Sequence, residues 1–262
     1  MNVNYGSTIP ISTVDWHGKV SVVFFLRGCP YRCPYCQNHA LLFESNMVDT
    51  SVLEVQMKKS RPFVSNIVLS GGEPLMQKDT VIHLARFAKK NGLLVGIHTN
   101  GYYPHVMAEL IEKGLADKFF IDVKAPLDKA ELYSKAIGCM DYADIHIDHK
   151  VAMEKVAQSI ILALGSNVEL ELRTTIIRDF MGSPDDVCDI ARSINELTGR
   201  LDVTYVLQQG LAENSMLESL RDKKPLSRDE LFGLARVAHE FLDNIYVRTR
   251  EKGNEKVNFK SV

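Results

Sequence analysis

The segment Cys29-Pro30-Tyr31-Arg32-Cys33-Pro34-Tyr35-Cys36 is the most informative stretch of the chain. It contains three cysteines in the spacing C-x3-C-x2-C, and no fourth cysteine lies nearby. Three thiolates can hold three irons of a cubane cluster, which leaves one iron without a protein ligand. Because a substrate can bind directly at an open coordination position, the spacing indicates a metal centre that performs chemistry.

Other uses of these cysteines have to be weighed. His39 follows Cys36 at a distance that suits a Cys3His zinc site, so a structural zinc site stays open. Gly28, Pro30 and Pro34 mark an irregular loop, which disfavours unrelated cysteines buried in a packed core. A disulfide is disfavoured because pairing two cysteines leaves the third one odd, and because nothing in the sequence indicates secretion.

Length and composition favour one large α/β domain over residues 1–262, of which 45% are hydrophobic. A formal net charge of −2 gives no general attraction for nucleic acid, so no nucleic-acid partner is expected. The N-terminus lacks the features of a signal peptide, and apolar runs such as Val20–Leu26 are too short to cross a bilayer. We therefore expect a cytoplasmic protein without a membrane partner. Its mixed-charge tail is expected to be solvated from Arg248 and flexible from about residue 249.

Short apolar or β-branched runs alternate with helical patterns along most of the chain. The runs read as buried parallel strands: Val20–Leu26, Asn66–Leu69, Leu93–His98, Lys118–Val123, Val168–Ile177 and Asp202–Leu207. The predicted helices are Asp79–Asn91, Pro104–Lys113, Lys150–Leu164 and Pro184–Leu197. Strand and helix in alternation predict right-handed crossovers and a parallel sheet, which spacing alone could place in a barrel or in a doubly wound sheet.

Polar motifs follow the predicted strands at the edge where parallel α/β folds place their active sites. Gly71 and Gly72 allow a ligand to approach the backbone closely, and Glu73 offers a carboxylate to an ammonium group. A tight structural turn is the alternative for this motif. Thr99 and Asn100 end the next strand, where they could equally form a capped turn.

Charged residues end the later strands. Asp122 and Lys124 point to the same face, either as part of a site or as an ion pair at a barrel rim. Arg173 shares a face with Glu171, so it could bind a ligand carboxylate or balance that glutamate. Gln208 and Gln209 end the sixth predicted strand, and the sequence does not choose between them.

Together, these motifs resemble the radical S-adenosylmethionine (SAM) enzymes, whose signature is C-x3-C-x-aromatic-C, with Tyr35 as the aromatic. The resemblance implies a partial (β/α)6 barrel and a [4Fe-4S] cluster on Cys29, Cys33 and Cys36, with SAM chelated by the fourth iron. It also implies that the glycines and Glu73 contact the SAM amino group. The residues expected to bind the cofactors are Tyr35, Gln37, Gly71, Gly72, Glu73, Asn100, Asp122, Lys124, Arg173 and Gln209.

One branch of this family fits best. Ser12-Thr13-Val14-Asp15-Trp16-His17-Gly18 and Phe24-Phe25-Leu26-Arg27-Gly28-Cys29 resemble the start of the anaerobic ribonucleoside-triphosphate reductase activating protein and related glycyl-radical-enzyme activases. That resemblance implies a 5′-deoxyadenosyl radical that installs a glycyl radical on a partner enzyme, with flavodoxin or ferredoxin as electron donor. Relatives commonly have Asp where His98 stands, which puts a monovalent cation site in doubt.

Two further readings remain open. A radical SAM enzyme that modifies a small molecule or RNA would share every motif above. A non-enzymatic zinc or iron–sulfur protein would leave the strand-end motifs unexplained. Outside the loop only Cys139 and Cys188 remain, too few for a second four-thiolate cluster, and each is expected to be a small buried residue.

Overall fold

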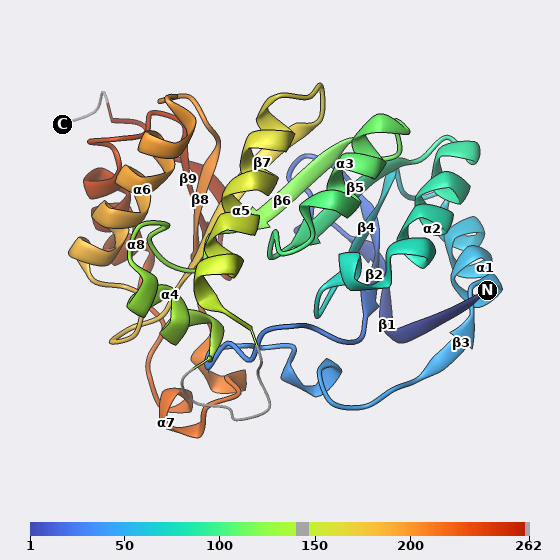
Figure 1. The fold of residues 1–262 in the computed structure, drawn as a ribbon, viewed down its shortest axis with the longest axis horizontal. Helices are drawn as coiled ribbons and strands as arrows, with labels where there is room; N and C mark the ends of the chain where they lie inside the picture. The colour runs from blue at the N-terminus through green and yellow to red at the C-terminus, as the bar shows by residue number, and fades with distance from the viewer. Residues whose placement is uncertain (140–146, 260–262) are drawn as a thin grey trace. The chain divides into compact units, whose positions relative to one another are not determined.

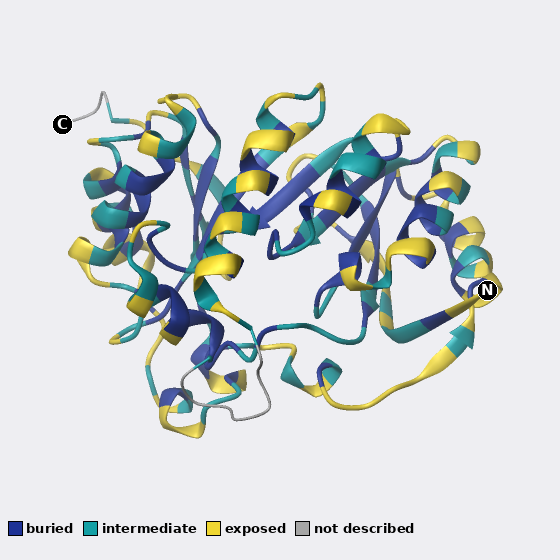
Figure 2. Cartoon of the chain, viewed as in Figure 1, coloured by how far each residue is buried: buried dark blue, intermediate teal, exposed yellow. Residues whose placement is uncertain are grey.

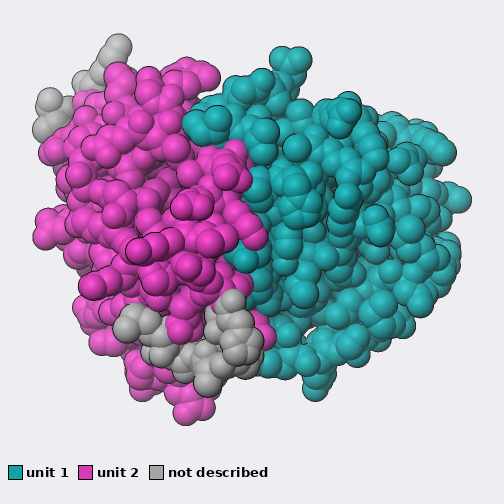
Figure 3. All heavy atoms as spheres, viewed as in Figure 1, with its two compact units in different colours: residues 1–30, 38–120, 161–170 teal, residues 31–37, 121–160, 171–262 magenta. Residues whose placement is uncertain are grey.

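The computed structural model of the chain describes residues 1–139 and 147–259, with its elements labelled in Figure 1. The chain divides into two compact units (Figure 3). Unit 1 comprises Met1–Pro30, Asn38–Phe120 and Ile161–Leu170; unit 2 comprises Tyr31–Gln37, Ile121–Ile160 and Glu171–Val262. The boundary therefore falls within the cysteine loop, with Cys29 in unit 1 and Cys33 and Cys36 in unit 2. That the whole chain acts as a single domain stays a prediction.

The strands of unit 1 run in the order β3-β1-β2-β4-β5 (Figure 1). Their bounds in this order are Met47–Asp49, Asn2–Ser12, Ser21–Leu26, Asn66–Gly71 and Leu94–Thr99. β2, β4 and β5 are parallel, whereas β1 is antiparallel to β2 and β3. The register pairs Leu26 with Gly71 and Leu69 with Ile97, so the loops after these three strands leave from the same edge.

Unit 2 repeats this plan with parallel strands β7, β8 and β9, followed by β10 antiparallel to β9. Their bounds are Glu169–Ile176, Tyr205–Gln209, Ile245–Thr249 and Gly253–Lys256, and the first two residues of β7 belong to unit 1. β6 (Lys118–Asp122) begins in unit 1 and ends in unit 2. Just after it, the Val123 N–H donates to the Arg173 carbonyl at 2.8 Å.

The helices connect these strands. In unit 1 they are α1 (Ser51–Ser60), α2 (Lys78–Lys90) and α3 (Pro104–Glu112), with short 3-10 turns η1 (His39–Leu41) and η2 (Pro74–Gln77). Unit 2 contains α4 (Ala130–Ile137), α6 (Pro184–Thr198), η3 (Ala212–Asn214), α7 (Glu218–Arg221) and α8 (Arg228–Ala238). α5 (His149–Leu164) crosses from unit 2 to unit 1.

The strands form the cores, as their apolar composition predicts. Val22, Val23 and Phe24 of β2 are fully buried, as are Ile67 and Val68 of β4. Figure 2 shows such strands almost wholly buried, whereas the helices alternate between buried and exposed residues. Strands covered on both faces need near-continuous apolar sequence. All six predicted strands and all four predicted helices are present, with ends moved by a few residues.

The sequence reading missed several elements. Only two of the eleven residues of β1 are buried, so it lacks the continuous apolar run by which the buried strands were found. α8 was also missed. It begins with a capping box, in which the Ser227 side chain accepts from the Glu230 N–H and the Glu230 side chain accepts from the Ser227 N–H.

The structure corrects the prediction made for the charged tail. In place of the flexible tail expected from about residue 249, Gly253–Lys256 forms β10 and pairs with β9. Arg228 holds Glu255 through two hydrogen bonds of 2.9 Å, which places the charges of this segment in an ordered hairpin. Such a partner lies too far along the chain to be found from charge pattern alone.

Candidate functional site

The Gly71-Gly72-Glu73 turn lies directly against the residues that lead into the first cysteine. The Gly72 N–H donates to the Leu26 carbonyl at 2.9 Å, and the Glu73 N–H donates to the Gly28 carbonyl at 2.8 Å. A Cβ atom at Gly72 would lie 2.2 Å from the Gly28 oxygen and 3.2 Å from the Cys29 Cβ. A side chain at that position would therefore displace the cysteine loop, which is the physical reason for a glycine there.

Glu73 is fully buried, and its carboxylate joins the ends of two strands. Oε1 accepts from the Leu75 N–H at 3.0 Å and from the Thr99 hydroxyl at 2.9 Å, while Oε2 accepts from the Asn100 N–H at 2.7 Å. The carboxylate thus holds the β4 and β5 loops together. Its predicted contact with the amino group of SAM stays a prediction.

Asn100 connects this hydrogen-bonded group to the cluster loop. Its side-chain Nδ2 donates to Cys29 Sγ at 3.6 Å, and its Oδ1 accepts from the Tyr102 N–H at 2.9 Å. Asn100 is buried, so its amide has a fixed orientation. Unit 1 therefore brings together five of the predicted site residues: Cys29, Gly71, Gly72, Glu73 and Asn100.

His98 is held by neighbours in unit 1. Its Nδ1 lies 3.3 Å from the Ser70 hydroxyl and its Nε2 lies 3.2 Å from the Asp15 carbonyl. The imidazole also meets the Phe120 ring edge to face, with centroids 4.7 Å apart. These contacts explain the position of the imidazole within the fold. The predicted effect of His98 on a monovalent cation site stays a prediction.

In unit 2, the second half of the cysteine loop is fixed by contacts that the sequence did not indicate. The Cys36 N–H donates to the Cys33 carbonyl at 2.9 Å, which closes a tight turn. The Arg32 N–H donates to the Ile137 carbonyl at 3.0 Å, and the Leu217 N–H donates to the Pro34 carbonyl at 2.8 Å. The Gln37 side chain is exposed and donates to the carbonyl of Leu211 at 3.2 Å.

Asp122 and Lys124 form an ion pair of 2.7 Å beside this turn. Lys124 Nζ also lies 5.8 Å from the centroid of the Tyr35 ring, which is buried. Burial raises the pKa of the Cys33 thiol to about 12, and the positive charge of Lys124 opposes that shift. Metal binding would have to displace the thiol proton, and Lys124 would stabilise the resulting thiolate.

Arg173 balances Glu171, which was one of the two roles left open for it. Its Nε lies 2.7 Å from Glu171 Oε1, and Nη2 of Arg248 lies 3.0 Å from the same oxygen. Gln208 Oε1 accepts from Arg248 Nη1 at 3.4 Å, so Gln208 joins this charged group. The sequence did not identify Arg248 as part of this group, because it was placed at the start of the solvated tail.

Gln209 has both ends of its amide engaged by backbone groups. Its Nε2 donates to the Leu226 carbonyl at 2.8 Å, and its Oε1 accepts from the Arg250 N–H at 2.9 Å. Between the two glutamines, the structure therefore favours Gln208 as the residue on the polar face. A contact of Gln209 with SAM stays a prediction.

The donor set fits an iron–sulfur cluster. None of the five cysteines, all of which lie in the described part of the chain, forms a disulfide. Thiolates are the usual ligands of such clusters, and Asn100 supplies a second-shell donor to one of them. Within residues 1–139 and 147–259, no three His, Cys, Asp or Glu side chains are grouped around a position for a single metal ion. His39 is half-buried in η1, and the zinc alternative gains no ligand group from the described residues.

The two remaining cysteines belong to other segments of unit 2. Cys139 donates its thiol to the Ile147 carbonyl at 3.3 Å, and Cys188 lies on α6. Both are partly exposed, which differs from the expectation that they are buried. No helix among the described residues is long and apolar enough to cross a bilayer.

Comparison with known proteins identifies a family and several relatives. A family model described as the radical SAM superfamily matches residues 23–178. A protein of Methanocaldococcus jannaschii, named as a candidate glycyl-radical enzyme activating enzyme, is 35% identical over 92% of this chain and 94% of that relative. The pyruvate formate-lyase 1-activating enzyme of Escherichia coli is 28% identical over 55% of this chain and 60% of the relative.

Solved structures agree on the fold. A radical SAM methyltransferase from Sphaerobacter thermophilus matches with a TM-score of 0.66 at 14% identity, over 89% of this chain and 67% of that one. This likeness confirms the α/β fold as the partial (β/α)6 barrel of the radical SAM type. Since the family model covers more than half of the chain, the protein belongs to the radical SAM superfamily and is an enzyme whose cofactors are a [4Fe-4S] cluster and SAM.

Proposed function

We propose that this enzyme installs a glycyl radical on a partner enzyme, and that the partner is an anaerobic ribonucleotide reductase. The observation that supports the general activity is the 35% identity over nearly the full length of both chains to a protein named as an activating enzyme of this kind. The choice of ribonucleotide reductase rests on the resemblance of Ser12–Gly18 and Phe24–Cys29 to that branch.

The chain's own residues have distinct tasks in this proposal. Cys29, Cys33 and Cys36 would hold three irons of the cluster, and the buried Glu73 would keep the loops around Cys29 in a fixed position. Lys124 would place a positive charge beside Cys33. Bound by these residues, the cluster would supply the electron for reductive cleavage of SAM, with flavodoxin or ferredoxin as its reductant, so that hydrogen would be taken from a glycine of the partner.

Positioning is the main demand that this chemistry makes on the protein. A primary radical must meet one C–H bond at contact distance before it meets anything else, so small displacements strongly lower the rate of the reaction. The backbone hydrogen bonds around Gly28 and Glu73 meet that demand because they fix the first cysteine from two sides. We place the activity in the cytoplasm, where cysteine thiols stay reduced.

The test uses protein reconstituted with iron and sulfide without oxygen, reduced, and mixed with SAM and the anaerobic ribonucleotide reductase of the same organism. We expect 5′-deoxyadenosine together with a glycyl radical seen by electron paramagnetic resonance (EPR) on the reductase. Cys33→Ala is the control and should give neither product. Cleavage of SAM without a radical on the reductase would contradict the proposed partner, and absence of cleavage would contradict the proposed activity.

A further inference from the structure

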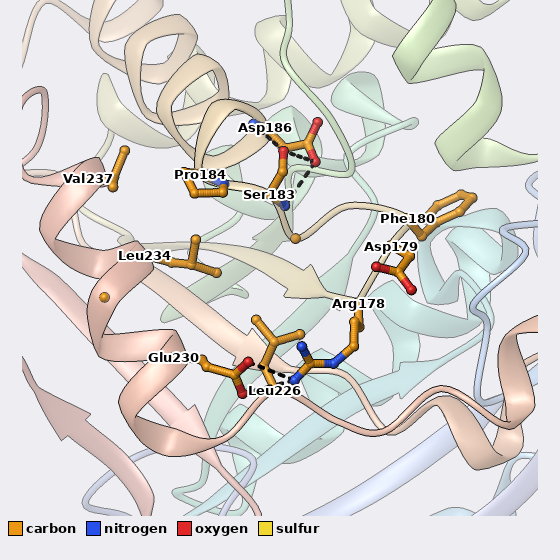
Figure 4. Close-up of a pocket in the computed structure, with 12 residues that line it drawn as sticks. Arg178, Asp179, Phe180, Ser183, Pro184, Asp186, Leu226, Glu230, Leu234 and Val237 are labelled. Carbon is orange, nitrogen blue, oxygen red and sulfur yellow. Dashed lines mark hydrogen bonds and ion pairs between the residues drawn. The ribbon is translucent and has the colours of Figure 1, made fainter.

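We propose that a cavity in unit 2, between the β7–α6 loop and α8, binds an apolar side chain of a polypeptide segment that also has a Lys or Arg close by. The cavity has a volume of about 560 Å³ and is shown in Figure 4. This is the size of typical ligand pockets. The inference rests on the proposed function, since the segment would belong to the protein partner.

Gly233 is the first observation that supports a binding role. It lies in the middle of α8, on the cavity wall, and a Cβ atom built on it would meet no atom within 4 Å. Glycine inside a helix lowers the stability of that helix relative to alanine. Neither the backbone conformation nor packing requires a glycine here, so its effect is to leave the wall of the cavity open.

The polar groups of the cavity are already engaged within the protein. Arg178 donates two hydrogen bonds of 2.9 Å to the carboxylate of Glu230. Asp186 accepts from the Ser183 N–H at 3.1 Å and from its hydroxyl at 2.7 Å, as part of the capping box of α6. Figure 4 shows both interactions at the edge of the cavity. What remains for a ligand is therefore mainly apolar surface.

That surface is supplied by Phe180, Leu226 and Leu234, which come from three separate segments. Among the residues that line the cavity, Arg178 is basic and Asp179, Asp186 and Glu230 are acidic. Ion pairs join Arg178 to Glu230 and Asp179 to Lys223, which leaves Asp186 as the acidic lining residue without an ion pair among the described residues. An apolar group that arrives with a cation nearby matches this combination better than a neutral or anionic ligand does.

The cavity also adjoins the cluster loop within unit 2. The ring of Phe180 lies 5.5 Å from the ring of Tyr35, the residue directly before Cys36. Asp179 has a φ of 61° and is held by an ion pair of 2.7 Å with Lys223, which fixes the turn that presents Phe180. A protein substrate anchored here would gain binding energy remote from the reacting glycine, which enzymes use to position the reacting group.

Binding can be tested directly with fluorescein-labelled nonapeptides measured by fluorescence anisotropy on the reconstituted enzyme. The probe has one Phe between two Lys; the comparison peptides replace the Phe by Ser or both Lys by Glu. We expect the probe to bind at least about tenfold more tightly than either comparison peptide. Equal binding of all three peptides, or no binding of the probe, would overturn the proposal.

Variants at Gly233 separate the cavity from other surfaces. Gly233→Phe fills the cavity and should weaken probe binding by at least about tenfold, whereas Gly233→Ala should leave it unchanged and raise the melting temperature. Val237→Phe, one turn further along α8, fills the same cavity if the first variant does not fold. Both filled variants should cleave SAM at the wild-type rate in the absence of a partner.

The partner reaction distinguishes this inference from the function on which it rests. With ribonucleotide reductase, Gly233→Phe should raise the KM for the reductase and leave SAM cleavage without it unchanged. Equal KM values for wild type and Gly233→Phe would overturn the cavity proposal while the proposed function stands. Specific probe binding without any glycyl radical on wild-type mixtures would instead contradict the proposed function and support the cavity.

Discussion

Two buried carboxylates, one in each unit, are held in opposite ways. Glu73 in unit 1 accepts three hydrogen bonds from neutral donors: two backbone N–H groups and one hydroxyl. Glu171 in unit 2 is held by two guanidinium groups, those of Arg173 and Arg248. The first arrangement fixes local backbone, and the second joins three side chains through charge.

The difference indicates how each region responds to change. A carboxylate bound by backbone groups is held by the chain itself, so it acts as a fixed part of the loop that holds Cys29. A carboxylate shared by two arginines can lose one of them and keep the other. The unit 2 group is therefore expected to tolerate loss of an arginine better than loss of the glutamate.

The largest expected effect on stability comes from changes to Glu171 and the two arginines that hold it. Glu171→Gln should lower the free energy of unfolding by about 3–5 kcal/mol, because it leaves the buried guanidinium group of Arg173 and the half-buried one of Arg248 facing a neutral amide. Arg173→Met should be less costly, since Glu171 keeps Arg248. Urea denaturation of both variants measures the difference. Equal losses would show that Arg248 does not compensate.

Substitution of Glu73, which is held by neutral donors, should have a smaller effect on stability. Glu73→Gln turns one acceptor into a donor next to buried N–H groups, at an expected cost of about 1–3 kcal/mol. Thr99→Val removes the hydroxyl donor to Glu73 together with the acceptor for the Gly101 N–H, and it leaves both backbone donors to the carboxylate in place; it serves as the comparison, with an expected loss of about 1–3 kcal/mol. A glutamine variant as stable as wild type would contradict the fixed role assigned to Glu73.

The third prediction concerns the cluster itself. Asn100→Asp keeps the acceptor for the Tyr102 N–H and removes the N–H donor to Cys29. A donor to sulfur stabilises the reduced cluster, so its loss should lower the midpoint potential. One hydrogen bond of about 1 kcal/mol corresponds to roughly 40 mV for one electron, and the added negative charge acts in the same direction.

Asn38 offers a control for that experiment. Its side chain donates to the Gly71 carbonyl at 3.1 Å, in the same turn, and the structure shows no contact of it with Sγ of Cys29 among the described residues. Asn38→Asp should therefore change the potential much less than Asn100→Asp. Potentiometric titration followed by EPR compares the two, and equal shifts would assign the effect to added charge alone.

The sequence predicted what depends on neighbours along the chain. The strand Asn66–Leu69 and the turn at Gly71–Glu73 follow from an apolar run and from glycine chemistry, and both are present. The sequence could not choose between two roles for Arg173, because Arg248 meets Glu171 from 77 residues away. The contact of Asn100 with Cys29 joins residues 71 positions apart, so no local sequence pattern predicts it.

Register explains why the sequence could not choose between Gln208 and Gln209. Gln208 and Gln209 point to opposite faces of β8, and which face joins the charged group depends on the pairing of β8 with β9. The sequence of β8 alone does not determine that pairing. The ordered β10 likewise depends on Arg228, which precedes Glu255 by 27 residues.

The smallest predicted effect is a pH dependence of stability, and it extends the same comparison to the surface. The backbone N–H of Ser227, aided by Arg178, lowers the pKa of Glu230 to about 2. Hydrogen bonds from Lys113 and Lys78 lower the pKa of Glu109 to about 2. Both pKa values lie below the ordinary 4.5 of a glutamate, so each stabilises the fold above pH 4.5 and loses that contribution as the pH falls toward 2.

Melting temperatures of the cluster-free chain between pH 5 and pH 2 measure these contributions without interference from loss of the cluster in acid. Glu230→Gln and Glu109→Gln should each flatten part of the decline. Salt at about 1 M, where the Debye length is about 3 Å, should weaken the contribution of Glu109, which depends on two exposed lysines. It should weaken that of Glu230 less, because a backbone N–H bears no ionic charge for salt to screen. An equal effect of salt on both would show that Arg178, and not the capping box, provides most of the stabilisation at Glu230.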